Sequence, residues 1–354
     1  MTTDTTDSFT DVSRSIVVVI PTLNEVRTLE SVVDSLYVDP PLHATVSVVV
    51  VDGGSDDGTV ALVRRMQLTR PGLSLLPNPQ RIQSAGINLA ARAVGADAQV
   101  LIRCDAHADY PPGYVRHLVE TLDRTGADAV VVPMDSTGDS NVQRAVAWVS
   151  DTPVGSGGSA HRGGQRSGFI DHGHHAAFRL ESFRLVGGYD ESFTHNEDAE
   201  LDCRQRALGS RIYLDADIRL GYHPRDSVRG LWRQYFGYGR GRARTVRRHR
   251  GSMRLRQLAV PAHAAWCVAA LLLAPWFPLL LAWPALYIAI LTSVSVGLSL
   301  RKRSLVGLLA GPVAAVMHTA WAAGFFWSLV SVREGRWNAT QTAPWPHDGG
   351  MWRA

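Results

Sequence analysis

The chain has 354 residues, a formal net charge of +4 and 45% hydrophobic residues, which is enough for two or three domains with a sizeable core. Its arginines concentrate between Arg225 and Arg256, but no nucleic-acid-binding motif accompanies them, so we expect no nucleic-acid partner. The three cysteines, at positions 104, 203 and 267, are scattered, which argues against a disulfide framework and a cysteine metal site.

Composition divides the chain into five parts. Residues 1–14 are polar and lack the basic and apolar regions of a signal peptide, so we expect a disordered tail. Residues 15–226 are expected to form an α/β domain, and 227–257 an amphipathic, arginine-rich interfacial helix. A membrane segment at 258–332 and a C-terminal tail at 333–354 follow.

The membrane segment is predicted from an absence of charge. No Asp, Glu, Lys or Arg occurs in 258–300, a length that holds two spans broken near Pro275 and Pro278. A third apolar stretch, 305–332, is interrupted at Gly311 and Pro312, giving about three spans. The basic residues before the first span are typical of a cytoplasmic flank. We therefore expect a multi-pass protein of the inner (plasma) membrane with the 15–226 domain in the cytoplasm.

Strands and helices alternate in the first half of the chain. Apolar runs at 15–20, 46–51, 73–76 and 100–104 predict strands, and periodic stretches at 59–67 and 83–94 predict helices. A further helix is expected after residue 25, capped by Thr22 or Asn24. This alternation predicts a mostly parallel sheet, whose ligands lie at the C-terminal ends of its strands.

Polar residues follow three of these strands. Asp52 can accept a hydrogen bond from a base or ribose. Asp105 and His107 lie two residues apart after the strand at 100–104, so their side chains can point to the same side and bind one divalent cation. In the alternative interpretation, Asp105 caps the next helix and His107 is an ordinary loop residue.

The second half is less regular. A polar, glycine-rich tract at 155–168 is predicted to be a mobile loop over the site, and His172, His174 and His175 follow it with no standard zinc spacing. Glu197 and Asp198 open a predicted helix, where the helix dipole alone can explain them, or where a carboxylate can face a reacting hydroxyl. A strand is expected at 212–215. Arginines of the helix after residue 227 can neutralise a diphosphate leaving group.

Two nucleotide-binding classes are disfavoured by the loop after the first strand. Residues 21–25 read Pro-Thr-Leu-Asn-Glu where a dehydrogenase has its glycine-rich motif, and a Walker A lysine loop is absent. A sugar nucleotidylyltransferase also needs a glycine-rich loop with a basic residue at this place.

The motifs together resemble the inverting family 2 glycosyltransferases of the GT-A fold. The resemblance extends from residue 16 to about residue 244 and rests on the segments 21–25, 52–59, 78–81 with 85–88, and 196–198, and on Asp105. Within the family the chain is similar to the ExoA-type enzymes, which assemble succinoglycan and other exopolysaccharides. Asp-Ala-His at 105–107, the 233–239 segment and Met317-His318 carry that likeness.

The resemblance implies a metal-dependent hexosyltransferase that moves one sugar from a UDP-sugar to a lipid-linked saccharide. Asp198 is the implied base, with Glu197 beside it, and Asp105 and His107 are the implied ligands of Mg²⁺ or Mn²⁺; nitrogen ligation favours Mn²⁺. The implied nucleotide-sugar contacts are Pro21, Thr22, Glu25, Asp52, Arg81, Asp105, Arg240 and Arg242. The implied acceptor contacts are His174, His175 and Gln234.

Two alternatives remain open at the level of the sequence. The first is transfer directly to a polyprenyl phosphate. The second is a non-catalytic membrane scaffold of the GT-A fold, against which the presence of both Asp105 and Asp198 argues.

Overall fold

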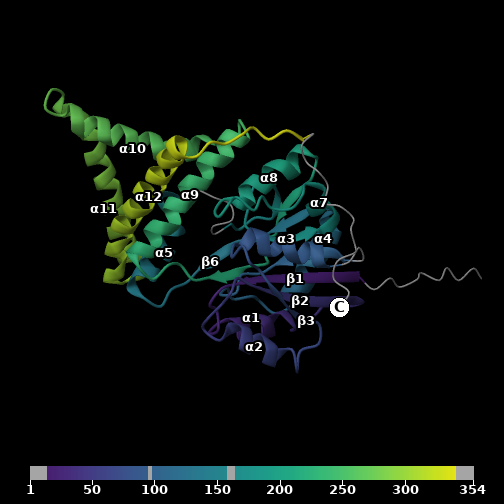
Figure 1. Ribbon diagram of the computed structural model, residues 1–354. Coiled ribbons are helices and arrows are strands. Elements are labelled where there is room, and N and C mark those ends of the chain that lie inside the picture. Colours follow the sequence, from purple (N-terminus) through teal and green to yellow (C-terminus); the bar gives the residue numbers. More distant parts are fainter. Residues whose placement is uncertain (1–13, 95–97, 158–163, 340–354) are drawn as a thin grey trace, which may run out of the picture.

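The computed structural model describes residues 14–94, 98–157 and 164–339 (Figure 1). Nearly all of the predicted N-terminal tail and residues 340–354 of the predicted C-terminal tail lie outside these ranges. Figure 1 shows two parts side by side, an α/β part built on a central sheet and a group of long helices that ends in yellow.

The central sheet has eight strands in the described part of the chain, in the order β3-β2-β1-β4-β8-β5-β9-β7. β1 (Arg14–Thr22) pairs in parallel with β2 (Ala44–Asp52) and β4 (Ala98–Arg103), and β2 pairs in parallel with β3 (Leu73–Pro77). The other strands are β5 (Ala129–Val131), β7 (Gly168–Ile170), β8 (His175–Arg179) and β9 (Ile212–Leu214). A small second sheet pairs β6 (Met134–Ser136) with β10 (Leu220–Tyr222).

Helices cover both faces of this sheet because its inner strands are apolar on both sides. In β1, Ile16, Val18 and Ile20 pack into one core, and Val17 and Val19 into the other. The first core includes residues of α1 (Leu29–Leu36), α2 (Thr59–Met66) and α4 (Tyr114–Thr125). The second includes residues of α3 (Gln83–Ala93), α7 (Leu180–Leu185) and α8 (Glu197–Ala207).

The structure confirms the four early strands, the strand at 212–215 and the helices at 59–67 and 83–94, within a few residues. The predicted cap of the first helix is wrong, because α1 begins only at Leu29. The Asn24 side chain instead accepts a hydrogen bond from the backbone of Asp56, and the Thr22 hydroxyl donates to the Ile20 carbonyl. Asn24 thus ties together the loops that follow β1 and β2.

β8 was not predicted, and its direction is opposite to that of both its neighbours in the sheet. It lies antiparallel between β4 and β5 and places His174 beside the end of β4. The predicted loop at 155–168 is described only in part, since residues 158–163 lie outside the described ranges. Its first residues belong to α6 (Pro153–Ser156), and its last begins β7.

Four long helices form the second part of the molecule. The predicted interfacial segment is divided, because α9 (Val228–Arg248) ends before α10 (Leu255–Leu273) begins. α11 (Ala282–Lys302) and α12 (Ala310–Ser331) follow, each preceded by a short 3₁₀ turn, η1 (Pro278–Leu281) and η2 (Leu305–Leu309). Among the residues that the structure describes, three stretches are long and apolar enough to cross a membrane: Leu255–Leu273, Pro278–Lys302 and Leu305–Ser331.

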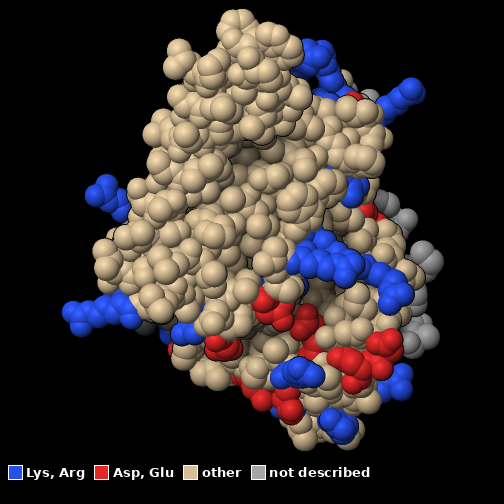
Figure 2. Space-filling view, turned by 90° about the vertical axis from the view of Figure 1, so that its left-hand side faces the viewer, with Lys and Arg blue, Asp and Glu red and all other residues tan. Residues whose placement is uncertain are grey.

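The surface of these helices is apolar and carries few charged side chains. Figure 2 shows a broad face almost free of Lys, Arg, Asp and Glu, with charged side chains gathered below it around a hollow. Large apolar side chains of α10, of α11 and of the connection between them are exposed, including Trp266, Leu272, Trp276, Leu279 and Ile288. An apolar patch of this kind on a soluble domain would promote association, whereas lipid tails can cover it.

α12 joins the membrane helices to the catalytic part. It packs along α9 and against α5 (Asn141–Ser150), and Val146, Leu231, Val313 and Met317 belong to the shared apolar core. The backbones of α9 and α12 approach closely at Gly324, where an added Cβ atom would lie 2.0 Å from the Phe236 carbonyl oxygen.

We predict that Gly324→Ala loosens this crossing, because the new methyl group meets backbone rather than a movable side chain. Overpacking of this kind costs about 1–3 kcal/mol, so the thermal unfolding temperature of the detergent-purified protein should fall by several degrees. Gly297→Ala in α11 is the matched control, since an added Cβ there meets no atom within 4 Å. Equal unfolding temperatures for the two variants would contradict the close packing of α9 on α12.

Candidate active site

One large cavity, of about 1150 Å³, lies at the C-terminal ends of β1 and β4 and extends to the long helices. The first half of the chain supplies part of its wall, including Pro21, Thr22, Glu25, Arg81, Asp105 and His107. α8 contributes Glu197 and Asp198, and α10 and α12 contribute Arg256, Val260, Met317 and Trp321. The edge of the sheet and the membrane helices therefore border the same space.

A buried arginine holds the acidic groups of this cavity together. Arg103 is the last residue of β4, and 5% of its side chain is exposed. Its Nη1 atom donates to Oδ1 of Asp198 at 2.5 Å, and its Nη2 atom lies 3.7 Å from Oε1 of Glu197 and 3.9 Å from Oδ1 of Asp105. One guanidinium group thus faces three carboxylates from two distant parts of the chain.

Asp198 is held in place by two donors and keeps one oxygen available. Arg103 and the Tyr189 hydroxyl both donate to Oδ1, the latter at 2.8 Å, while Oδ2 lies 3.9 Å from Nδ1 of His174. Among the described residues, none donates a hydrogen bond to Oδ2. Burial alone would raise the pKa of Asp198, but the charge of Arg103, with help from His175 and His174, holds that pKa below its usual value.

Glu197 is a different kind of acid from its neighbour. Burial, and secondarily the adjacent charge of Asp198, raise the pKa of Glu197 to about 7, and Arg103 only partly opposes this shift. Near neutral pH the site therefore contains one firmly ionised carboxylate and one that readily exchanges a proton.

Asp105 and His107 both line the cavity, but each has another partner. Oδ1 of Asp105 accepts from the Gln83 amide at 2.8 Å, and Nδ1 of His107 lies 2.9 Å from Oε1 of Glu25. The hydrogen bond to Glu25 raises the pKa of His107. A carboxylate on one imidazole nitrogen is typical of histidines that bind a metal through the other nitrogen.

Asp105 and His107 would be the two protein ligands of a cation at this site. The described residues contain no group of three or more His, Cys, Asp or Glu side chains arranged to hold a metal ion. Mg²⁺ and similar ions commonly take only one or two protein ligands and obtain the others from substrate phosphates and water. Asp105 and His107 are therefore compatible with a cation that is shared with a diphosphate.

Comparisons with known proteins agree with this geometry. Residues 17–187 match the family described as Glycosyl transferase family 2. The chain is also 43% identical over 323 residues to the succinoglycan biosynthesis protein ExoA of Rhizobium meliloti (strain 1021), covering 91% of this chain and 97% of that protein. The chain belongs to glycosyltransferase family 2.

The fold of this glycosyltransferase is shared with a solved structure. The mannosyltransferase PcManGT from Pyrobaculum calidifontis, in complex with GDP-Man and Mn²⁺, aligns with a TM-score of 0.59 at 21% sequence identity, covering 90% of this chain and 88% of that chain. The predicted family, enzyme class and GT-A fold with C-terminal membrane helices are thus confirmed.

Most of the predicted nucleotide contacts of the glycosyltransferase border the main cavity. Pro21, Thr22, Glu25 and Arg81 line it. Asp52 is not among the lining residues, because its carboxylate accepts hydrogen bonds from within its own loop, from the backbone of Gly54 and Ser55 and from the Ser55 hydroxyl. Asp52 therefore shapes the loop after β2.

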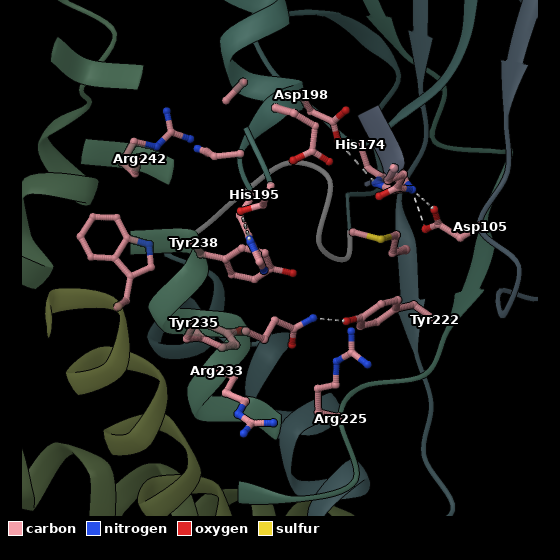
Figure 3. Close-up of a pocket in the computed structure, with 18 of the residues that line it drawn as sticks. Asp105, His174, His195, Asp198, Tyr222, Arg225, Arg233, Tyr235, Tyr238 and Arg242 are labelled. Atoms are coloured by element: carbon pink, nitrogen blue, oxygen red, sulfur yellow. Dashed lines mark hydrogen bonds and ion pairs between the residues drawn. The ribbon is translucent and has the colours of Figure 1, made fainter. Parts of the chain in front are cut away.

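The two predicted diphosphate arginines are separated by the structure. Arg240 lines a smaller cavity of about 400 Å³ between α9 and residues 192–195. Arg242 lines the main cavity, but Figure 3 shows it across Asp198 from Asp105, on the side of the membrane helices. Arg225, which the sequence analysis did not single out, also lines the cavity, and its positive charge opposes the rise in the pKa of His107 that Glu25 causes.

The predicted acceptor contacts also need one correction. His174 lies in the cavity between Asp105 and Asp198, and the Gln234 amide in its wall donates to the Tyr222 hydroxyl (Figure 3). His175 is fully buried instead, with Nε2 at 2.5 Å from Asp202 and its ring stacked on Phe178. The predicted acceptor contact at His175 is therefore wrong, because this side chain is enclosed by the protein and does not line the cavity.

Arg103 and Tyr189 are the residues that the sequence analysis missed. Arg103 could have been found in the sequence because it is the one charged residue in the apolar run at 100–104. Such a charge is costly to bury unless the fold provides a partner.

We predict that Arg103→Met raises the pKa of Asp198, because the charge that keeps the carboxylate ionised is removed. The acid limb of kcat/KM should move about 1–3 pH units upward in a sugar-transfer assay. Arg103→Lys keeps a positive charge and should move it less. A lower rate with an unchanged pH profile would mean that Arg103 only supports the fold, and UDP binding by both variants controls for unfolding.

Proposed function

We propose that this glycosyltransferase transfers one sugar from a UDP-sugar to a lipid-linked saccharide, with inversion, during exopolysaccharide assembly. The observation that carries this proposal is the single cavity that reaches from Asp105 and Asp198 to helices fit to cross a membrane. The similarity to a succinoglycan biosynthesis protein supports the pathway class. Basic residues at Arg254, Arg256 and 301–303 flank the first two candidate spans and support a cytoplasmic catalytic domain in the inner membrane.

In this proposal Asp198 is the general base. Its Oδ2 atom removes the proton from an acceptor hydroxyl as the hydroxyl oxygen attacks the anomeric carbon, and the bond from that carbon to UDP breaks. Arg103 and Tyr189 fix the carboxylate through Oδ1, so the accepting oxygen keeps its direction. One base without a covalent nucleophile inverts the anomeric centre, so an α-linked donor gives a β-linked product.

Asp105 and His107 would hold a divalent cation together with the donor diphosphate. When bound, Mg²⁺ or Mn²⁺ stabilises the negative charge that develops on the departing UDP. Glu25 orients His107 for this role through its Nδ1 contact, and Arg225 adds a positive charge nearby. The Mn²⁺ in the PcManGT complex is consistent with such a cation in this fold.

A product assay tests the function as a whole. Membranes containing the full chain would be incubated with a panel of radiolabelled UDP-sugars and a lipid extract, and the glycolipids analysed. The proposal expects a lengthened lipid-linked saccharide. A polyprenyl monophosphate sugar would instead support direct transfer to the lipid. The absence of both sugar transfer and UDP release with every donor would favour a non-catalytic scaffold.

The base can be assigned by comparing two neighbouring variants. Asp198→Asn should lower kcat by about 10²- to 10⁴-fold while UDP still binds, and Glu197→Gln should lower it less. Because the pKa of Asp198 is depressed, the parent enzyme should keep its activity well below pH 7. A larger loss in Glu197→Gln, with an acid limb near pH 7, would transfer the role to Glu197.

Metal dependence can be separated from folding by measuring nucleotide affinity. EDTA should abolish transfer, and added Mn²⁺ or Mg²⁺ should restore it. Asp105→Ala should weaken UDP binding in the presence of the metal and leave the weaker metal-free binding unchanged. Full activity in EDTA would contradict a catalytic cation.

A further inference from the structure

Arg242 is a buried cation at the end of the main cavity that is bordered by the membrane helices. Only 8% of the residue is exposed, yet it lines the main cavity. Within the described part of the chain it donates no hydrogen bond and forms no ion pair, and burial lowers the pKa of its guanidinium to about 10. Burying an unpaired charge is unfavourable, so a ligand that supplies negative charge would stabilise this residue.

The groups around Arg242 leave the region positively charged. Asp202 is a nearby carboxylate, but its two oxygens lie 2.6 Å from His172 and 2.5 Å from His175. Arg254 and Arg256 add further positive charge that acts on Arg242. Arg254 is paired with Asp171. Arg256 lines the cavity and donates to the Gly157 carbonyl, among its contacts. An anion is therefore the ligand that this end of the cavity favours.

The same end of the cavity is apolar where it meets the membrane helices. Arg256 is the second residue of α10, the first candidate span, and the lining continues with Val260 of α10 and with Met317 and Trp321 of α12. An anionic group next to an apolar wall at the start of a membrane span matches the chemistry of a lipid phosphate. A nucleotide has no apolar chain to place there.

The position of Arg242 relative to the other charged residues separates it from the donor. Asp105 follows β4 at the sheet edge, and both it and Arg225 act electrostatically on His107. Figure 3 shows Arg242 on the other side of Asp198 from Asp105. The base thus lies between two groups of positive or metal-binding residues. A bisubstrate site for a diphosphate donor and a phosphate-bearing acceptor needs this arrangement, with the reacting hydroxyl in the middle.

We propose that Arg242 and Arg256 bind the phosphate that joins the lipid of the acceptor to its saccharide, with the start of the lipid chain along Val260, Met317 and Trp321. This inference rests on the proposed lipid-linked acceptor. It reassigns Arg242 from the donor diphosphate, which the sequence analysis favoured. The saccharide then extends from the phosphate toward Asp198, so the distance between the two selects the sugar that is extended.

The test uses the detergent-purified full chain and farnesyl diphosphate, a short lipid diphosphate, with calorimetry as the readout. Arg242→Gln and Arg256→Gln should each weaken farnesyl diphosphate binding at least about tenfold, while UDP affinity with Mn²⁺ stays at the parent value. Arg229→Gln is the matched control, because Arg229 is an exposed arginine of the same helix that lines neither cavity. It should bind both ligands as the parent does.

Three binding results would overturn the inference. If a folded Arg242→Gln variant bound UDP more weakly and farnesyl diphosphate as the parent does, Arg242 would be assigned to the donor diphosphate. If inorganic pyrophosphate bound as tightly as farnesyl diphosphate, the lipid chain would contribute nothing to binding, and the proposed lipid contacts would be wrong. Displacement of farnesyl diphosphate by an equal concentration of phosphatidylglycerol would assign the arginines to bulk membrane headgroups.

Failure of the proposed function gives a different pattern. If no UDP-sugar yields a glycolipid but the two arginine variants selectively lose farnesyl diphosphate, the lipid-phosphate site stands and the reaction must be reconsidered. If both variants form glycolipid at the parent rate and with an unchanged acceptor KM, the proposed reaction is supported and the proposed lipid-phosphate site is contradicted.

Discussion

The contact between Arg103 and Asp198 is the interaction on which the catalytic site depends. It joins the end of β4 to the start of α8, and it brings together carboxylates that would otherwise repel one another. Replacing the cation would leave Asp105, Glu197 and Asp198 close together without compensation. Either protons would bind or the loops would separate, and both changes would remove an ionised base from the cavity.

A second constraint lies at the crossing of α9 and α12. α9 supplies Arg233, Gln234, Tyr238 and Arg242 to the cavity, and α12 supplies Met317 and Trp321. Because the two backbones approach so closely at Gly239 and Gly324, these two sets of side chains have a fixed relation to each other. The polar wall and the lipid-facing wall are thus positioned by a single helix pair.

Much of the fold could be predicted because its parallel strands are runs of β-branched residues buried on both faces. β8 escaped prediction because it is short, contains Ala176 and Ala177, and pairs only with strands far away in sequence. Arg103 escaped for a related reason, since its partner Asp198 lies 95 residues further along the chain.

Site residues could be predicted where their position at the end of a strand or helix was enough. The prediction failed where the face of the element on which a side chain lies decides its role. Asp105, Glu197 and Asp198 follow from their places at the ends of elements. His174 and His175 are adjacent in sequence but face opposite sides, and Arg240 and Arg242 differ by about 200° around their helix at 3.6 residues per turn. Neither difference can be read from a motif without knowing which face of the element is covered.

The apolar core shared by α5, α9, α11 and α12 has a practical consequence for expression of the enzyme. Removing the chain after residue 257 would uncover Ala145, Val146, Val149 and Leu231, which belong to the catalytic half but are covered by Leu291, Val313, Ala314 and Met317. The hydrophobic segment is therefore not a detachable anchor. A water-soluble fragment would need polar replacements on α5 and α9, and truncation alone would yield a protein prone to aggregation.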